Sequence, residues 1–151
     1  MKIALGSDHA GYRLKEEVAE LIREMGHEPL NMGTDSEESV DYPDFAVKVA
    51  EAVLAGEAPI GILVCGTGLG MAMSANKVPG IRAAVVSDTF SAHAAREHND
   101  ANILCIGARV VGTGLARDIV RTFVSATFEG GRHQRRVSKI AEIEKRFREA
   151  R

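Results

Sequence analysis

The sequence predicts an α/β protein, and three observations support that prediction. Short β-rich runs alternate with stretches whose apolar residues recur at helical spacing. Helical segments between successive strands favour parallel pairing. A composition of 45% hydrophobic and 26% charged residues over 151 positions is typical of one globular domain. We therefore expect residues 1–151 to form a single domain, a three-layer α/β/α sandwich around a Rossmann-like, five-stranded parallel sheet.

Five short runs are expected to form the strands of that sheet. The runs from Ile60 to Cys65 and from Arg82 to Val86 are apolar on both faces, which predicts strands covered by helices on either side. In order along the chain, the expected strands are Lys2 to Gly6, Glu28 to Met32, Ile60 to Cys65, Arg82 to Val86 and Asn102 to Gly107.

Six stretches are expected to form helices. The first presents one apolar stripe and ends at Gly26, and the second begins near Pro43, whose fixed φ suits a first helical turn. The last carries Val137, Ile140 and Phe147 at helical spacing, so we expect it to pack on its own sheet or on a second subunit. The expected ranges are about 14–25, 43–55, 69–76, 89–98, 114–128 and 132–149.

Charge and composition exclude several classes of partner. With 19 Lys and Arg against 21 Asp and Glu, the net charge of −2 favours neither nucleic acid nor an anionic membrane surface. The two cysteines, Cys65 and Cys105, both lie in apolar runs and cannot form a disulfide framework. No signal-peptide core or membrane-spanning run is evident. A cytoplasmic location is therefore expected.

The loops that follow the first and third strands are the candidate site, because ligands bind beyond the carboxyl ends of open parallel sheets. Glycines at 66, 68 and 70 let backbone amides approach a ligand where a helix begins, which predicts an anion cradle. The loop matches neither a Walker motif nor a dinucleotide fingerprint. Beside it, Cys65 is either a thiolate favoured by the helix dipole or a buried hydrophobe. Cys105, inside its strand, is expected in the core.

Other polar residues have a functional and a plainer interpretation. His9 and His98 adjoin polar residues at strand edges, but no His-x-x-x-His or Cys-x-x-Cys spacing occurs, so no metal site is expected. Arg132 and Arg136 share one helix face and can clamp a phosphate, although a solvated basic surface is the usual explanation for an arginine-rich helix. Arg109, after the fifth strand, is a third phosphate candidate or a surface residue.

Five segments stand out when they are taken in order. They are Gly6-Ser7-Asp8-His9-Ala10-Gly11, Asp41-Tyr42-Pro43-Asp44, Cys65-Gly66-Thr67-Gly68-Leu69-Gly70-Met71, Glu97-His98-Asn99 and Glu129-Gly130-Gly131-Arg132-His133-Gln134-Arg135-Arg136-Val137. Together they closely resemble the ribose-5-phosphate isomerase type B family, and the similarity runs the length of the chain. The resemblance implies an aldose–ketose isomerase that interconverts ribose 5-phosphate and ribulose 5-phosphate through an enediolate, with no metal and no cofactor.

The resemblance also implies a role for each site residue. Cys65 would move the proton as a thiolate, and His98 would open the sugar ring with help from Thr67 and Asp8. Thr67 as a turn residue and Asp8 as a helix cap are the plainer alternatives. The remaining binding residues are the amides of Gly66, Thr67, Gly68, Leu69 and Gly70 for the oxyanion, Asn99 for the sugar, and His9, Arg109, Arg132 and Arg136 for the phosphate.

The order of the strands adds a geometric expectation. His98 and Asn99 precede the fifth strand, at the amino edge of the sheet, whereas Cys65 ends another strand at the carboxyl edge. We therefore expect a homodimer with sites shared between subunits, and a tetramer stays open. Two other functions also stay open: an isomerase of allose 6-phosphate or galactose 6-phosphate, and a nucleotide-binding module without catalysis.

Overall fold

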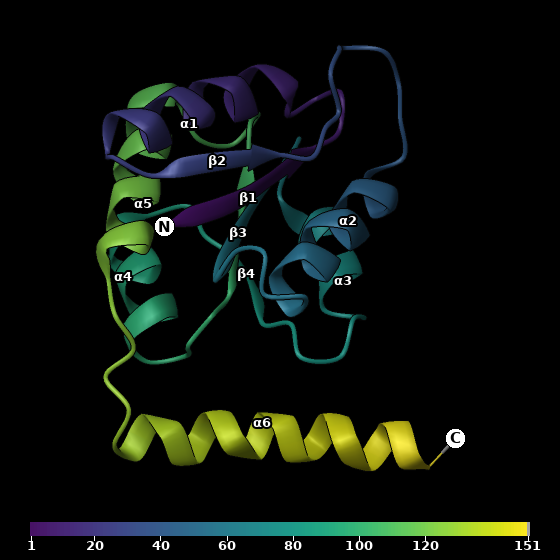
Figure 1. Ribbon diagram of the computed structural model, residues 1–151, viewed down its shortest axis with the longest axis vertical. Helices are drawn as coiled ribbons and strands as arrows, with labels where there is room; N and C mark the ends of the chain where they lie inside the picture. The colour runs from purple at the N-terminus through teal and green to yellow at the C-terminus, as the bar shows by residue number, and fades with distance from the viewer. Residues whose placement is uncertain (151) are drawn as a thin grey trace.

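The computed structural model describes residues 1–150 and is built on one five-stranded sheet (Figure 1). All neighbouring strands are parallel, and their order is β2-β1-β3-β5-β4. The predicted parallel α/β sheet is therefore confirmed. The strands are β1 (Lys2–Ser7), β2 (Glu28–Asn31), β3 (Ile60–Cys65), β4 (Ala83–Val85) and β5 (Ile103–Gly107).

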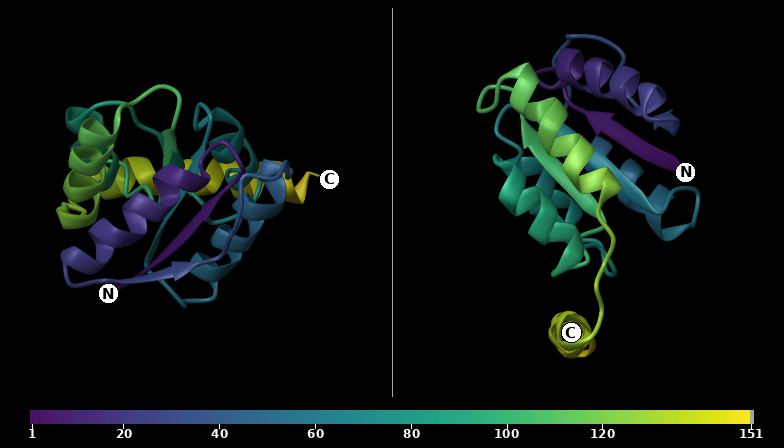
Figure 2. Two further views of the ribbon diagram at one scale, coloured as in Figure 1. Left: turned by 90° about the horizontal axis from the view of Figure 1, so that it is seen from above. Right: turned by 90° about the vertical axis from the view of Figure 1, so that its left-hand side faces the viewer.

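Helices cover both faces of the sheet, which gives the three predicted layers (Figure 2). Helices α1 (Tyr12–Glu24), α4 (Thr89–Glu97) and α5 (Thr113–Ser125) pack on one face with the apolar side chains that point there. Helices α2 (Tyr42–Leu54) and α3 (Leu69–Ala75) cover the other face. Among residues 1–150, no helix combines the length and the apolar character that crossing a membrane would require.

The central strand β3 divides the core in two. Ile62 and Val64 face the α1, α4 and α5 layer, whereas Leu63 and Cys65 face α2 and α3. All six residues of β3 are buried, as expected for a strand covered on both sides. Each buried aliphatic side chain stabilises the fold by roughly 1.5–3 kcal/mol. Two separate apolar layers thus hold the carboxyl end of β3 in place.

The expectation for the run from Arg82 to Val86 was wrong in one respect. β4 pairs only with β5 and lies at the edge of the sheet. Ala83 and Ala84 are half-buried, and Val85 is 38% exposed. An edge strand is covered less completely than a central one, and apolar composition alone does not reveal which strand occupies the edge.

The C-terminal part of the chain leaves the body of the molecule. α5 ends at Ser125 instead of continuing to 128, because Ala126 adopts an extended conformation. Helix α6 (Arg132–Glu149) then lies apart from the sheet, as Figure 1 and the right-hand view of Figure 2 show. Val137 is its only buried residue, whereas Ile140, Ile143 and Phe147 are 47–61% exposed. The alternative that α6 packs on its own sheet was therefore wrong.

Candidate active site

A pocket of about 300 Å³ opens at the carboxyl edge of the sheet, where β1 and β3 end. Ser7 of β1 pairs with Val64 of β3, so the loops that follow the two strands emerge side by side. The pocket brings together both predicted loops and residues from two other segments. Its lining residues are Asp8, His9, Ala10, Tyr42, Cys65, Gly66, Thr67, Gly70 and Arg109.

Cys65 occupies the floor of this pocket as the last residue of β3. Its side chain is mostly covered, with the residue 4% exposed, yet it lines the cavity. The amide of Gly68 donates a hydrogen bond to the Cys65 Sγ atom at 3.1 Å. Gly68 directs its amide there from a φ of +82°, a conformation that side-chain-bearing residues rarely adopt. This backbone donor fixes the position of the sulfur beside the glycine-rich loop.

The second cysteine behaves as the sequence predicted. Cys105 lies within β5, is fully buried and packs in the same apolar layer as Leu63. Burial raises the pKa of the Cys105 thiol, and the neighbouring Cys65 raises it further. Cys105 is therefore a neutral core residue, and only Cys65 of the two thiols faces the pocket.

Asp8 and His9 are both held by hydrogen bonds to backbone amides. The carboxylate of Asp8 accepts from the amide of Gly11 at 3.0 Å, which fixes the turn that leads into α1. The Nδ1 atom of His9 accepts from the amide of Val40 at 3.1 Å. Because Nδ1 is an acceptor there, the proton of a neutral His9 ring lies on Nε2. His9 is thus set up as a hydrogen-bond donor in the pocket.

Three further side chains shape the pocket. Arg109 lies so close over Gly66 that a Cβ atom at position 66 would meet the Arg109 Nη1 atom at 3.3 Å. The Thr67 Oγ1 atom accepts from the amide of Leu69 at 3.2 Å. The ring of Tyr42 lies against Gly70, where a Cβ atom would come within 2.4 Å of it. The glycines of the loop therefore make room for Arg109 and Tyr42.

Tyr42 is a pocket residue that sequence reasoning did not single out. It belongs to the segment Asp41-Tyr42-Pro43-Asp44, which was noted only for its part in the family resemblance. The amides of Gly68 and Leu69 take part in hydrogen bonds within the loop, and neither residue lines the pocket. The side chain of Leu69 is instead exposed at the start of α3.

Four predicted site residues lie at the opposite edge of the sheet. His98 is the C-terminal cap of α4 and Asn99 follows it, before the amino end of β5. Arg132 and Arg136 belong to the first turns of α6. None of these four lines the pocket of Cys65, and Asn99 instead borders a shallow groove with Val85 and Phe90. The structure therefore divides the predicted site between two edges of one chain.

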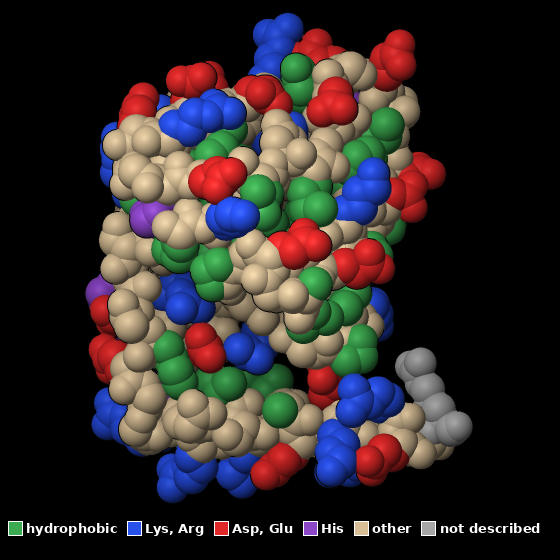
Figure 3. Space-filling model, viewed as in Figure 1, with side chains coloured by type: hydrophobic (Ala, Val, Ile, Leu, Met, Phe, Trp, Pro, Cys, Tyr) green, Lys and Arg blue, Asp and Glu red, His purple; other side chains and the backbone are tan. Residues whose placement is uncertain are grey.

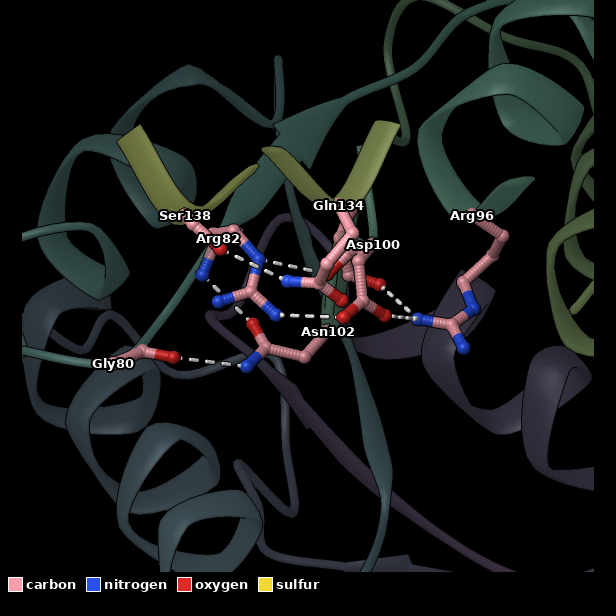
Figure 4. Close-up of polar contacts among 8 residues, drawn as sticks. Gly80, Arg82, Arg96, Asp100, Asn102, Gln134 and Ser138 are labelled. Atoms are coloured by element: carbon pink, nitrogen blue, oxygen red, sulfur yellow. Dashed lines mark hydrogen bonds and ion pairs between the residues drawn. The ribbon is translucent and has the colours of Figure 1, made fainter. Parts of the chain in front are cut away.

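The loop that carries His98 and Asn99 is anchored by a polar network (Figure 4). Asp100 has a φ of +48° and accepts hydrogen bonds from both Arg82 and Arg96, each at 3.2 Å. Arg82 also donates to the Asp100 carbonyl at 2.9 Å, and the Asn102 side chain donates to the Gly80 carbonyl at 3.0 Å. These bonds fix the turn between α4 and β5 and hence the position of His98.

Replacement of Asp100 by alanine is expected to lower the free energy of unfolding by about 1–3 kcal/mol, because it removes two partly buried ion pairs and leaves alanine in a left-handed conformation. Urea denaturation measures this loss. Asp118→Ala is the control, because it removes an exposed ion pair to Arg121 and should cost less than about 0.5 kcal/mol. Equal losses in the two variants would contradict the anchoring role of Asp100.

Comparison with known proteins places the chain in a family. A family model described as Ribose/Galactose Isomerase matches residues 3–140, and the chain belongs to this family. It is 51% identical over 145 residues to ribose-5-phosphate isomerase B of Escherichia coli, covering 96% of this chain and 97% of that protein.

Solved structures agree with this membership. The fold matches ribose-5-phosphate isomerase B of Clostridium thermocellum with a TM-score of 0.95 and 59% identity, covering 97% of this chain and 99% of that one. It also matches ribose-5-phosphate isomerase B of Mycoplasma genitalium, solved with bound ribulose 5-phosphate, at a TM-score of 0.91 and 42% identity over 95% and 96% of the two chains. The chain is an isomerase of this family.

Proposed function

We propose that this chain interconverts ribose 5-phosphate and ribulose 5-phosphate by proton transfer through an enediolate. The observation that carries the proposal is a pocket with a thiol on its floor, a backbone donor on that sulfur, and His9 and Arg109 at its wall. A base, an oxyanion site and phosphate ligands are what an aldose–ketose isomerisation needs. Relatives named for this reaction, one of them solved with ribulose 5-phosphate, support the same substrate.

Cys65 is the base in this mechanism. As a thiolate it removes the proton from C2 of the open-chain aldose and, as a thiol, delivers a proton to C1 of the enediolate. The hydroxyl proton of O2 passes to O1 in the same conversion, which yields the ketose. The amides of Gly66 and Gly70, both lining the pocket, face the oxygen on which negative charge develops. One such donor is typically worth about 3 kcal/mol of barrier. The Gly68 amide, already bonded to the Cys65 Sγ atom, stabilises the base instead.

The phosphate is bound by cationic and neutral donors from separate segments. His9, with Nε2 as its donor, and Arg109 contribute from the pocket itself. Arg132 and Arg136, at the start of α6, lie at the opposite edge of the sheet and therefore contribute from the second subunit of the dimer proposed below. Arginine suits this role because its planar group forms paired hydrogen bonds with phosphate oxygens. A local cluster of this kind agrees with a net charge near zero.

Ring opening requires the two edges of the sheet to meet, so we propose a homodimer with shared sites. His98 and Asn99 of one subunit then complete the pocket of Cys65 in the other. The side chains of Ile140, Ile143 and Phe147 support this assembly, because 47–61% of each residue stays exposed within residues 1–150. Figure 3 shows hydrophobic side chains along the inner side of α6 and charged ones along its outer side.

Residues 1–151 act as one isomerase domain, with α6 bracing the dimer. A tetramer of such dimers is the larger alternative.

Compartment and substrate size belong to the same proposal. A cytoplasmic location fits a catalytic thiol and a second unpaired cysteine, since both need reducing surroundings. A six-carbon substrate needs room for one more carbinol unit. The pocket, about 300 Å³ in volume, is open to solvent, and its size alone does not select between the two substrates. The ratio of kcat/KM for ribose 5-phosphate and allose 6-phosphate measures which one the enzyme prefers. We expect the pentose phosphate to be preferred.

Turnover of ribose 5-phosphate in the presence of a metal chelator tests the proposed reaction. We expect full activity with and without the chelator, because the mechanism uses only protein groups and needs no metal and no cofactor. Ribulose 5-phosphate formation is the readout. Absence of ribose 5-phosphate turnover would refute the proposed function, and activity lost to the chelator and restored by added metal would refute the metal-free mechanism.

A further inference from the structure

Three side chains with metal-binding atoms converge where α4 ends and α6 begins. They are His98, Glu129 and His133, and their ligand atoms all lie within 4.8 Å of one another. The two imidazole rings are stacked, with centroids 4.3 Å apart and planes inclined by 10°. The Glu129 Oε2 atom lies 3.6 Å from the His133 Nε2 atom. We refer to these three residues as the histidine cluster.

Backbone contacts hold the histidine cluster together. The amide of Glu129 donates to the carbonyl of Glu97 at 3.1 Å, so the segment that leaves α5 lies against the end of α4. The amide of His133 donates to the carbonyl of Gly130 at 3.1 Å. Gly130 and Gly131 both have positive φ and turn the chain sharply into α6. These backbone contacts therefore place the three side chains next to one another.

The donor set defines the kind of ligand. Two imidazoles and one carboxylate are a common protein donor set for zinc, and imidazole favours Zn²⁺, Co²⁺ and Ni²⁺ over Mg²⁺. An imidazole lone pair lies in the plane of its ring, so two parallel rings do not point at one ion. Binding therefore requires one ring to rotate and the stack to open, after which the ion holds His98 through a ring nitrogen.

We propose that the histidine cluster binds a divalent transition-metal cation of the zinc type and that this cation inhibits the isomerase by immobilising His98. The inhibition rests on the proposed function, in which a free His98 imidazole opens the sugar ring. His93 and Glu97 on α4 form a comparable pair at 2.7 Å without a third ligand. They belong to no such cluster among residues 1–150 and serve as the matched control.

Titration with Co²⁺, followed by its visible absorption, tests binding independently of activity. We expect wild type and His93→Phe to bind one ion per chain without a thiolate charge-transfer band. Glu129→Gln and His133→Phe should bind at least about 10–100-fold more weakly, since even indirect partners of a metal ligand are worth that much. His133→Phe keeps an aromatic ring in the stack but has no ligand nitrogen. Wild type that does not bind Co²⁺, or that binds it no better than the two variants, would overturn the site.

Inhibition by Zn²⁺ then tests the consequence for turnover. Zn²⁺, but not Mg²⁺, should inhibit ribose 5-phosphate turnover by wild type and His93→Phe. Glu129→Gln and His133→Phe should resist it, when the inhibition of each protein is expressed relative to its own rate without metal. Inhibition of equal strength in all four proteins, with a thiolate band in the Co²⁺ spectrum, would place the ion on Cys65 and overturn the proposal. If wild type turns over no ribose 5-phosphate, the proposed function fails, whereas the Co²⁺ titration still decides the site.

Discussion

Replacement of Cys65 by alanine is expected to lower kcat for ribose 5-phosphate by about 10²–10⁴-fold, the usual contribution of a positioned acid–base group. The variant removes the only thiol that faces the pocket, while alanine still fits the end of a strand packed on both sides. KM should change much less, because His9 and Arg109 still bind the phosphate. Initial rates over a range of substrate concentrations separate the two constants.

Cys105→Ala is the matched control for this experiment. Cys105 is fully buried in β5 and its thiol pKa is raised, so it has no access to substrate. The control should keep its kcat and lose about 1 kcal/mol of stability through a small cavity. A Cys65→Ala enzyme with nearly normal kcat would remove Cys65 from the role of base. A Cys105→Ala enzyme as inactive as Cys65→Ala would show that the loss is not specific to the pocket.

Mixing two inactive variants is expected to restore activity. Cys65→Ala and His98→Ala each lack one half of every site, but a mixed dimer contains one site with both wild-type residues. Random association makes half of the dimers mixed, so co-refolded protein should reach about a quarter of wild-type activity. The activity of the refolded mixture, compared with each variant refolded alone, is the measurement.

The matching control mixes two variants of the same edge. Cys65→Ala and Thr67→Ala both change the carboxyl edge. In a mixed dimer of these two variants, each of the two sites therefore still carries one substitution. That mixture should show no more activity than the two variants refolded separately. No recovery in the first mixture, with mixed dimers present by mass, would mean that each chain builds its own site.

The order of elements was predictable because it depends on local patterns. A single apolar stripe at helical spacing identified α1. Gly26 marked the end of α1 and Pro43 the start of α2, and each lies within two residues of the helix end in the structure. The loop after β3 was predictable for the same reason, since its glycines follow an apolar run ending at Cys65. Cys105 was correctly assigned to the core from its position inside a strand.

What could not be predicted depends on contacts between distant segments. The edge position of β4 follows from strand order, which no single stretch of sequence contains. Tyr42 reaches the pocket because α2 packs beside α3 and brings its ring onto Gly70. His98, Glu129 and His133 meet only because the turn after α5 returns to α4, so a search for short metal-binding motifs did not find them. In each case, tertiary packing brings together residues that are far apart in the sequence, so their spacing along the chain does not predict the contact.

The central claim is that Cys65 moves a proton between two carbons of the pentose phosphate. Isotope exchange with the solvent tests this claim most directly. The measurement is the deuterium content of both sugars, by nuclear magnetic resonance, after incubation in deuterium oxide. We predict that deuterium enters C1 of ribulose 5-phosphate and C2 of recovered ribose 5-phosphate, and that Cys65→Ala slows this exchange as strongly as it lowers kcat. Turnover or exchange that continues undiminished in Cys65→Ala would contradict the mechanism.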